Sequence, residues 1–174
     1  LYEKRVDPRD LPFFLGLLDH LAAGGVACPV PVRARDGEAL RDLAGRRAAI
    51  VTFLPGMWPR RVTPEHCAEV GRALAEMHLA GMSFDGTRRN ALSAHAWRPL
   101  LNSAGPEVDQ VQMGLMSKLQ RDLDEIEAGW PADLPTGVIH ADLFPDNVFF
   151  RGNELTGLID FYFACRDFLV YDLA

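Results

Sequence analysis

The sequence has no apolar run long enough to cross a membrane. Its main apolar stretches, residues 48–54 and 148–150, fall far short of the roughly 20 residues that a transmembrane helix needs. An excess of positive charge is also absent: 24 acidic residues stand against 18 basic ones, for a net charge of −6. These two absences argue against a membrane protein and against a protein that binds nucleic acid through its phosphate backbone.

Cysteine is scarce as well. The three cysteines, Cys28, Cys67 and Cys165, are odd in number, widely spaced and set among apolar residues. A free thiol in such surroundings behaves as a small hydrophobic side chain, and the spacing shows no disulfide framework. We therefore expect a reducing, cytoplasmic compartment.

The length and composition fit one globular domain or part of one. The chain has 174 residues, 48% of them hydrophobic and 24% charged, which is enough to bury a core without disulfides or a structural metal. It opens on Leu1 rather than Met and stops at Ala174 inside an apolar stretch. We expect a fragment of a longer protein, and no signal-peptide pattern lies near Leu1.

The first half of the chain alternates between helical and extended patterns. Apolar residues recur at steps of three and four over residues 10–23, which predicts a helix with Asp10 as its N-cap. Two strands joined by a turn are expected over 26–35 and 46–54, the second of them buried. A second helix is predicted over 63–81, because a Thr-Pro pair opens an apolar helical face there.

The second half ends in a small β region. Residues 82–107 are rich in polar and turn-forming residues and predict irregular structure or short helices. Helical spacing over 108–128 predicts another long helix. After it the apolar period changes to two, which predicts short strands at 138–139 and 148–150 and a strand over 155–159 that closes a hairpin with its predecessor.

Polar side chains interrupt these last strands at fixed places. His140, Asp142 and Asn147 lie in a loop between two strands, and Asp160 ends the strand that returns to the same end of the hairpin. An amide oxygen and a carboxylate brought together there suit Mg²⁺, a hard ion that also binds phosphate oxygens and water. A second carboxylate, Asp142, could then accept a hydroxyl proton. This is the arrangement that phosphoryl transfer requires.

Each of these residues also has a plain structural interpretation. His140 alone could be a hydrogen-bonded loop residue, Asp142 a turn former, and 146–147 a common turn dipeptide. The combination His-x-Asp-x₄-Asn, followed thirteen residues after Asn147 by Ile-Asp-Phe, must satisfy four identities and three spacings at once. The joint pattern therefore favours the chemical interpretation.

Residues 140–147 and 159–174 resemble the kinase-like small-molecule phosphotransferases, a family that includes aminoglycoside phosphotransferases and choline kinases. Within that family they look most like the homoserine kinases. The resemblance spans nearly the whole chain and implies an α/β (α+β), protein kinase-like, two-lobed fold that is incomplete at both ends. Residues 1–54 would form part of the N-terminal lobe with its hinge strand, and 55–174 part of the helical C-terminal lobe. The other matching segments are 1–5, 10–15, 53–56 and 74–78.

The resemblance also implies roles for the residues of the loop and hairpin. Asp142 would be the catalytic base that receives the substrate proton, and His140 would support the catalytic loop. Asn147 and Asp160 would be the Mg²⁺ ligands. Asp172 matches the later aspartate that hydrogen-bonds the backbone of the catalytic loop in this family, which is a structural role.

A nucleotide site is implied by the same likeness. The backbone of Thr52, Phe53 and Leu54 would meet the adenine of ATP at the hinge. Lys4 lies on the strand that carries the phosphate-binding lysine in the family, and could meet the α- and β-phosphates.

The implied reaction is ATP- and Mg²⁺-dependent phosphorylation of the homoserine hydroxyl, a step of threonine biosynthesis. Arg88 and Arg89 lie where the family places substrate-side elements and could hold the homoserine carboxylate, because arginine binds carboxylates through two parallel hydrogen bonds. Two alternatives stay open: the same chemistry on another alcohol, such as choline or an aminoglycoside, and a non-catalytic nucleotide-binding module. The oligomeric state does not follow from the sequence.

Overall fold

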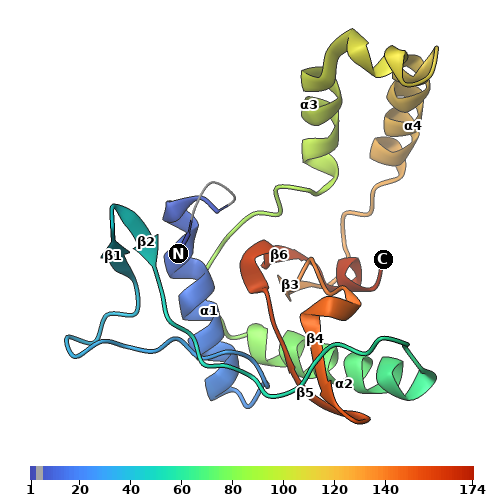
Figure 1. The fold of residues 1–174 in the computed structure, drawn as a ribbon. Helices are drawn as coiled ribbons and strands as arrows, with labels where there is room; N and C mark the ends of the chain where they lie inside the picture. The colour runs from blue at the N-terminus through green and yellow to red at the C-terminus, as the bar shows by residue number, and fades with distance from the viewer. Residues whose placement is uncertain (3–5) are drawn as a thin grey trace. The chain divides into compact units, whose positions relative to one another are not determined.

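Helix α1 spans Leu11–Ala23 in the computed structural model, which describes residues 1–2 and 6–174 (Figure 1). A short 3-10 helix, Pro8–Asp10, leads into it. Asp10 is the N-cap, although its carboxylate makes no capping hydrogen bond. The predicted helix is confirmed, and its buried residues are Leu11, Phe14, Leu15, Leu17, Leu18 and Leu21.

Helix α2 spans Pro64–Gly81 and is also confirmed. Its start is fixed by a capping box: the Thr63 hydroxyl accepts from the His66 backbone N–H, and His66 Nδ1 accepts from the Thr63 backbone N–H. This reciprocal pairing satisfies backbone donors that the first helical turn leaves without partners. At the other end Gly81 lies against Val138, where a Cβ would come within 3.1 Å of the valine side chain.

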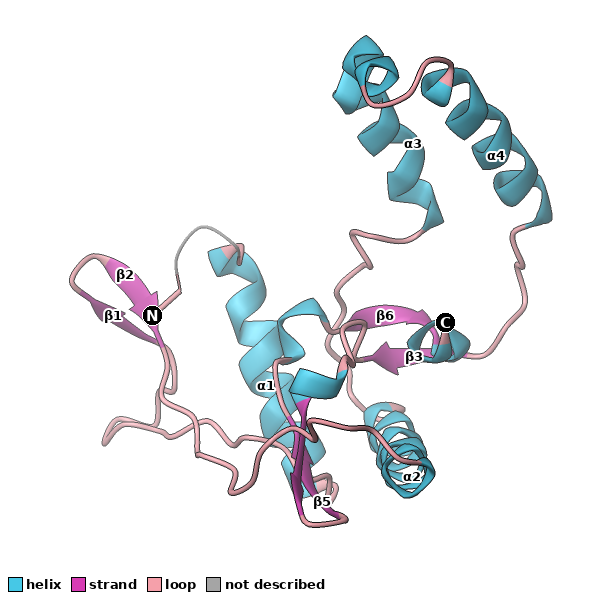
Figure 2. Ribbon diagram, turned by 45° about the vertical axis from the view of Figure 1, so that its right-hand side comes forward, coloured by secondary structure: helices cyan, strands magenta, loops and turns pink. Residues whose placement is uncertain are grey.

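Two antiparallel strand pairs lie beside these helices (Figure 2). Strand β4 (Val148–Arg151) pairs with β5 (Glu154–Leu158), which confirms the predicted hairpin. Strand β3 (Thr136–Ile139) pairs with β6 (Cys165–Phe168). The sequence pattern predicts β3 but not β6, because the Cys-Arg-Asp-Phe segment has no clear alternation of apolar and polar residues.

One apolar core joins α1 and α2 to the strands. Burial of each large side chain contributes about 1.5–3 kcal/mol, so the core holds the β4–β5 hairpin firmly against the helices. The core residues are Leu17, Leu18, Leu21, Val26, Cys28, Ala73, Leu74, Met77, Val138, Val148, Phe150, Leu158, Phe161 and Ala164.

Of the two strands predicted over 26–35 and 46–54, only residues 46–48 form a regular strand. These segments meet at an antiparallel bridge between Pro31 and Val51. There the Val32 N–H donates to the Ile50 carbonyl oxygen at 2.8 Å, and the Thr52 N–H donates to the Val30 carbonyl oxygen at 2.9 Å. The regular hairpin here joins β1 (Arg41–Leu43) to β2 (Arg46–Ala48).

The predicted burial of the second of these segments was also wrong. Ile50 is 70% exposed and Phe53 is 85% exposed. An apolar run indicates that a segment can be buried, but it does not say which other part of the protein would cover it.

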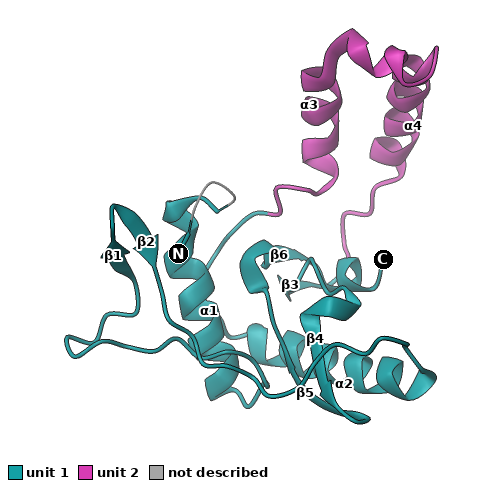
Figure 3. Ribbon diagram, in the orientation of Figure 1, with its two compact units in different colours: residues 1–89, 135–174 teal, residues 90–134 magenta. Residues whose placement is uncertain are grey.

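The chain divides into two compact units, Leu1–Arg89 with Pro135–Ala174, and Asn90–Leu134 (Figure 3). The elements above belong to the first unit. The predicted lobe boundary after residue 54 lies inside that unit and stays a prediction. Among residues 1–2 and 6–174, no helix is both long and apolar enough to cross a bilayer.

The second unit contains helices α3 (Ala94–Ala104) and α4 (Leu115–Gly129), with the 3-10 helix Gly105–Gln110 between them. Arg98 on α3 forms ion pairs with Asp124 and Glu127 on α4. The prediction that the long helix begins at residue 108 was wrong, because Gly114 adopts a left-handed conformation with a φ of +80° and separates the 3-10 helix from α4.

Gly157 in β5 offers a test of the hairpin packing. Its φ is +156°, and an added Cβ would lie 2.5 Å from Leu54 Cδ1 and 2.8 Å from the Ala27 carbonyl oxygen. We expect Gly157→Ala to lower the free energy of unfolding by more than about 2 kcal/mol, because both the backbone and the contact become strained.

The matched control is Gly71→Ala, since Gly71 lies inside α2 with open space around the new methyl group. There the substitution should raise stability by about 0.5–1 kcal/mol. Urea denaturation measures both variants, and equal effects at the two glycines would contradict the packing at Gly157.

Candidate active site

The loop that follows β3 folds back on Asp142. Ala141 adopts a left-handed backbone conformation with a φ of +62°, and the Phe144 N–H donates to the Asp142 carbonyl oxygen at 2.9 Å. A 3-10 helix, Pro145–Asn147, then returns the chain to β4. The loop therefore brings Asn147 back beside Asp142.

Asn147 links Asp142 to the hairpin. Its Nδ2 donates to the Asp142 carbonyl oxygen at 2.7 Å and to Asp142 Oδ2 at 3.1 Å. Because the amide nitrogen is committed in this way, Oδ1 is the Asn147 atom left for a cation. The Asn147 carbonyl oxygen accepts from the Ile159 N–H at 2.9 Å, which places Asp160 directly after a residue bonded to Asn147.

Asp160 itself is exposed and adopts a left-handed conformation, with φ +63° and ψ +58°. This conformation is uncommon for a residue other than glycine and persists where the surrounding structure enforces it. The structure thus brings together His140, Asp142, Asn147 and Asp160, the four residues that the sequence pattern singled out.

His140 is completely buried beneath this loop. Its Nε2 lies 2.9 Å from the Ile159 carbonyl oxygen, and because a carbonyl oxygen can only accept, Nε2 carries the proton. Nδ1 is buried with no hydrogen-bond partner in the described part of the chain, and the ring packs 4.6 Å from that of Phe161. Burial lowers the pKa of His140, against the opposing effects of the Ile159 bond and of the carboxylates of Asp172, Asp142 and Asp160.

The lowered pKa of His140 predicts a loss of stability in acid. Below the ordinary pKa of 6.5, the unfolded chain binds a proton at this histidine while the folded chain does not. The free energy of unfolding should therefore fall as the pH drops below 6.5, by up to about 1.4 kcal/mol per pH unit, until the pH reaches the lowered pKa of the folded state.

Urea denaturation between pH 5 and pH 8 tests this expectation (about one unit or more to each side of the ordinary value). In His140→Gln the free energy of unfolding should change less per pH unit, by the contribution of one proton. His95→Gln, at an exposed histidine, is the control variant. The same change per pH unit in His140→Gln as in the natural protein would contradict a neutral, buried His140.

Asp172 holds the start of the loop that follows β3. Its side chain is only 1% exposed. Its carboxylate accepts from the backbone N–H groups of His140 at 2.9 Å and Ala141 at 2.7 Å. His78 Nε2, at the end of α2, lies 2.7 Å from Asp172 Oδ2. The sequence pattern does not predict this contact, because nothing in it pairs residues 94 positions apart.

A cavity of about 330 Å³ opens beside the predicted base. Asp142 lines it together with Ala141, Phe144 and Tyr171. This volume is at the lower end of the range found for small-molecule sites, so the Asp142 carboxylate lies where a small alcohol could reach it.

The described residues among those predicted to bind ATP differ in their surroundings. Thr52 exchanges two hydrogen bonds with Val30, from its backbone N–H to the Val30 carbonyl and from the Val30 N–H to its Oγ1, both at 2.9 Å. Leu54 lies close to Gly157 of β5, while Phe53 is exposed. Lys4 lies outside the described residues, and the assignment of all four to nucleotide binding stays a prediction.

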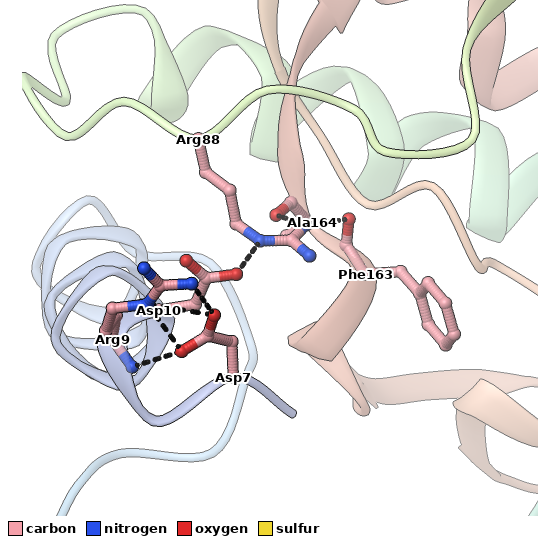
Figure 4. A network of polar contacts seen from close by, with 6 residues as sticks. All are labelled: Asp7, Arg9, Asp10, Arg88, Phe163 and Ala164. Carbon is pink, nitrogen blue, oxygen red and sulfur yellow. Dashed lines mark hydrogen bonds and ion pairs between the residues drawn. The ribbon is translucent and has the colours of Figure 1, made fainter. Parts of the chain in front are cut away.

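The two arginines predicted on the substrate side have different surroundings. Arg88 is mostly buried and binds Asp10 and two backbone carbonyl groups (Figure 4). Arg89 is exposed, and its backbone forms a bridge with Arg166.

The donor set at the end of the hairpin suits a hard cation. Asn147 Oδ1 and the Asp160 carboxylate are both oxygen donors of the kind that Mg²⁺ prefers. Within the described ranges, no three His, Cys, Asp or Glu side chains form a cluster that could hold a metal by themselves. Mg²⁺ does not need such a cluster, since it binds one or two protein groups and completes its shell with phosphate oxygens and water.

Comparison with known proteins gives consistent results. Residues 1–174 match the family described as the phosphotransferase enzyme family. The chain is 62% identical over its whole length to a homoserine kinase of Rhodospirillum rubrum, of which it covers 54%, and 62% identical to a homoserine kinase of Nitrobacter hamburgensis, of which it covers 53%. The chain therefore spans about half the length of these curated relatives.

Solved structures with a similar backbone include an amicoumacin kinase and a spectinomycin phosphotransferase. An amicoumacin kinase bound to AMP-PNP and Ca²⁺ matches with a TM-score of 0.72 at 15% identity, over 96% of this chain and 52% of that one. A spectinomycin phosphotransferase bound to ADP and spectinomycin matches with a TM-score of 0.69 at 15% identity, over 94% of this chain and 56% of that one. At such identity the likeness concerns the fold alone.

Proposed function

The chain belongs to the phosphotransferase enzyme family and has its protein kinase-like fold, and on that premise we propose that the protein is a cytoplasmic kinase that phosphorylates the side-chain hydroxyl of L-homoserine. ATP would be the phosphoryl donor and O-phosphohomoserine, an intermediate of threonine biosynthesis, the product. The observation that supports homoserine as the substrate is the 62% identity to homoserine kinases over the whole chain.

The proposed reaction is a direct in-line transfer without a covalent enzyme intermediate. The homoserine hydroxyl oxygen attacks the γ-phosphorus of ATP, its proton passes to the Asp142 carboxylate, and ADP leaves. Asn147 holds Asp142 Oδ2 through its Nδ2, which orients the accepting carboxylate. Positioning and charge neutralisation supply most of the rate in this class of reaction.

Mg²⁺ would be held by Asn147 Oδ1 and the Asp160 carboxylate. When bound, Mg²⁺ neutralises charge on the phosphate groups of the nucleotide. The residues of the chain fix the two ligands: His140 donates to the carbonyl group of Ile159, directly before Asp160, and Asp172 holds the backbone at the start of the loop.

The remaining binding roles complete the proposal. The backbone of Thr52, Phe53 and Leu54 would meet the adenine and Lys4 the phosphates. The exposed Arg89 is available to bind the homoserine carboxylate, whereas the contacts of Arg88 give that arginine a different role, argued below.

The test is ADP release by the full-length protein with Mg²⁺ and ATP, offered homoserine, choline and kanamycin in separate reactions. We expect turnover with homoserine and none with the other two. Turnover with choline or kanamycin alone would keep the mechanism and overturn the substrate. Nucleotide binding without turnover of any of the three would favour a binding module.

A further inference from the structure

Arg88 joins two segments that lie far apart in the sequence (Figure 4). Its Nε donates to Asp10 Oδ2 at 2.8 Å. Its Nη1 donates to the carbonyl oxygens of Phe163 and Ala164, each at 3.1 Å. The guanidinium carbon also lies 5.0 Å from the centre of the Phe14 ring, within the range of a cation–π contact.

These bonds leave Arg88 poorly suited to bind a carboxylate of the substrate. A guanidinium binds a carboxylate through one of two forked edges, which pair Nη2 with either Nε or Nη1. Nε is committed to Asp10 and Nη1 to two carbonyl groups. Neither forked edge is intact, so the prediction that Arg88 holds the homoserine carboxylate conflicts with its contacts.

The two carbonyl groups that Arg88 binds lie three and four residues after Asp160. Upstream of Asp160, Ile159 is held on both sides, since its N–H donates to the Asn147 carbonyl oxygen and its own carbonyl oxygen accepts from His140. Downstream, the 3-10 helix Phe161–Phe163 leads to Ala164. Asp160 therefore lies in its left-handed conformation between two fixed segments. The second is held by the burial of Phe161 and Ala164 in the core and by the two bonds from Arg88.

Asp10 is well placed to hold the Arg88 guanidinium. Asp10 precedes α1, and its carboxylate, which makes no capping bond, is free to accept from Arg88. The Arg88 carbonyl oxygen accepts from the Arg166 N–H at 2.8 Å, so the backbone of Arg88 is fixed as well. The guanidinium thereby transmits the position of α1 to the loop after Asp160.

We propose that Arg88 is a positioning residue that holds the loop 161–164 so that Asp160 presents its carboxylate beside Asn147. This inference rests on the proposed function, because the role of Asp160 as a Mg²⁺ ligand does. Arg88 would thus support the binding of Mg²⁺ through Asp160, and Arg89 would be the arginine that is available to bind the substrate.

The test compares Arg88→Gln and Arg88→Lys with the natural full-length protein. In Arg88→Gln, amide hydrogen exchange over residues 160–166 should become about tenfold faster, and Mn²⁺ should bind about tenfold more weakly in the presence of ADP, measured by electron paramagnetic resonance. This is the change expected from the loss of one set of charged hydrogen bonds. The KM for homoserine should stay close to that of the natural protein. Arg88→Lys keeps the charge beside Asp10 but cannot span both partners, so it should show the same changes to a smaller degree.

The control is Arg9→Gln, since Arg9 pairs with Asp7 on the exposed surface close by (Figure 4). It should leave amide hydrogen exchange, Mn²⁺ binding and KM unchanged.

A raised KM for homoserine in the Arg88 variants, with unchanged Mn²⁺ binding and exchange, would overturn the proposal in favour of a substrate contact. Arg88 variants that behave like the control would overturn it as well. If Arg88→Gln does not fold, Arg88→Lys decides between these outcomes. If the natural protein does not phosphorylate homoserine while exchange and Mn²⁺ binding change as expected, the proposed substrate fails and the role of Arg88 stands.

Discussion

Replacing Asp142 by Asn is expected to lower kcat for homoserine phosphorylation by about 10²–10⁴-fold, the usual contribution of a general base. The amide cannot take the hydroxyl proton. It can still accept from Asn147 Nδ2, which now lies 3.1 Å from Asp142 Oδ2, so the loop should keep its shape. Steady-state kinetics should therefore show a large fall in kcat with little change in the KM for ATP.

Asp146→Asn is the matched control for Asp142→Asn. Asp146 lies in the same loop and is exposed, so its substitution removes a neighbouring negative charge without touching the proposed base. We expect its kcat to stay close to that of the natural protein. Equal losses in the two variants would show that the charge of the loop, rather than a proton acceptor at Asp142, supports the reaction.

The second large effect is expected at Asp172. Asp172→Ala removes the acceptor for two backbone N–H groups and for His78 in a place where the carboxylate is almost fully buried. A buried donor left without a partner costs about 1–3 kcal/mol. The free energy of unfolding should therefore fall by about 2–5 kcal/mol, and kcat should fall with it because the catalytic loop loses its support.

Urea denaturation and kinetics of Asp172→Ala test this, with the exposed Asp85→Ala as control. His78→Ala should cost less, since it removes one of the three contacts. The double variant should cost clearly less than the sum of the two single variants, because residues that share one network are not additive. Strict additivity would contradict a direct bond between His78 and Asp172.

Local chemistry made much of this structure predictable. The start of α2 at Thr63 and Pro64 depends on residues close in sequence. The same holds for the repeat of apolar residues along α1, α2 and the β4–β5 hairpin, and the structure confirms these elements. The spacing of His140, Asp142, Asn147 and Asp160 was informative for the same reason, because one hairpin sets their placement. The burial predicted for residues 46–54 failed because burial depends on distant segments.

The contacts that support the site were not predictable in this way. The pairs His78–Asp172 and Arg88–Asp10 join residues 94 and 78 positions apart. A single sequence contains no period or spacing that links such residues. The family resemblance implies a substrate contact for Arg88, and only its bonds to Asp10 and the loop carbonyl groups point to the proposed positioning role.

The hydrogen bond from the Ile159 N–H to the Asn147 carbonyl oxygen also bears on the order of folding. It closes a short loop within one hairpin, and hairpins of this kind form in about 1–10 μs. The bond between His78 and Asp172 needs a far larger loop to close, at a higher cost in chain entropy. We therefore expect a folding chain to bring the amide of Asn147 and the carboxylate of Asp160 together early, and to fix the catalytic loop in its final position only when α2 docks.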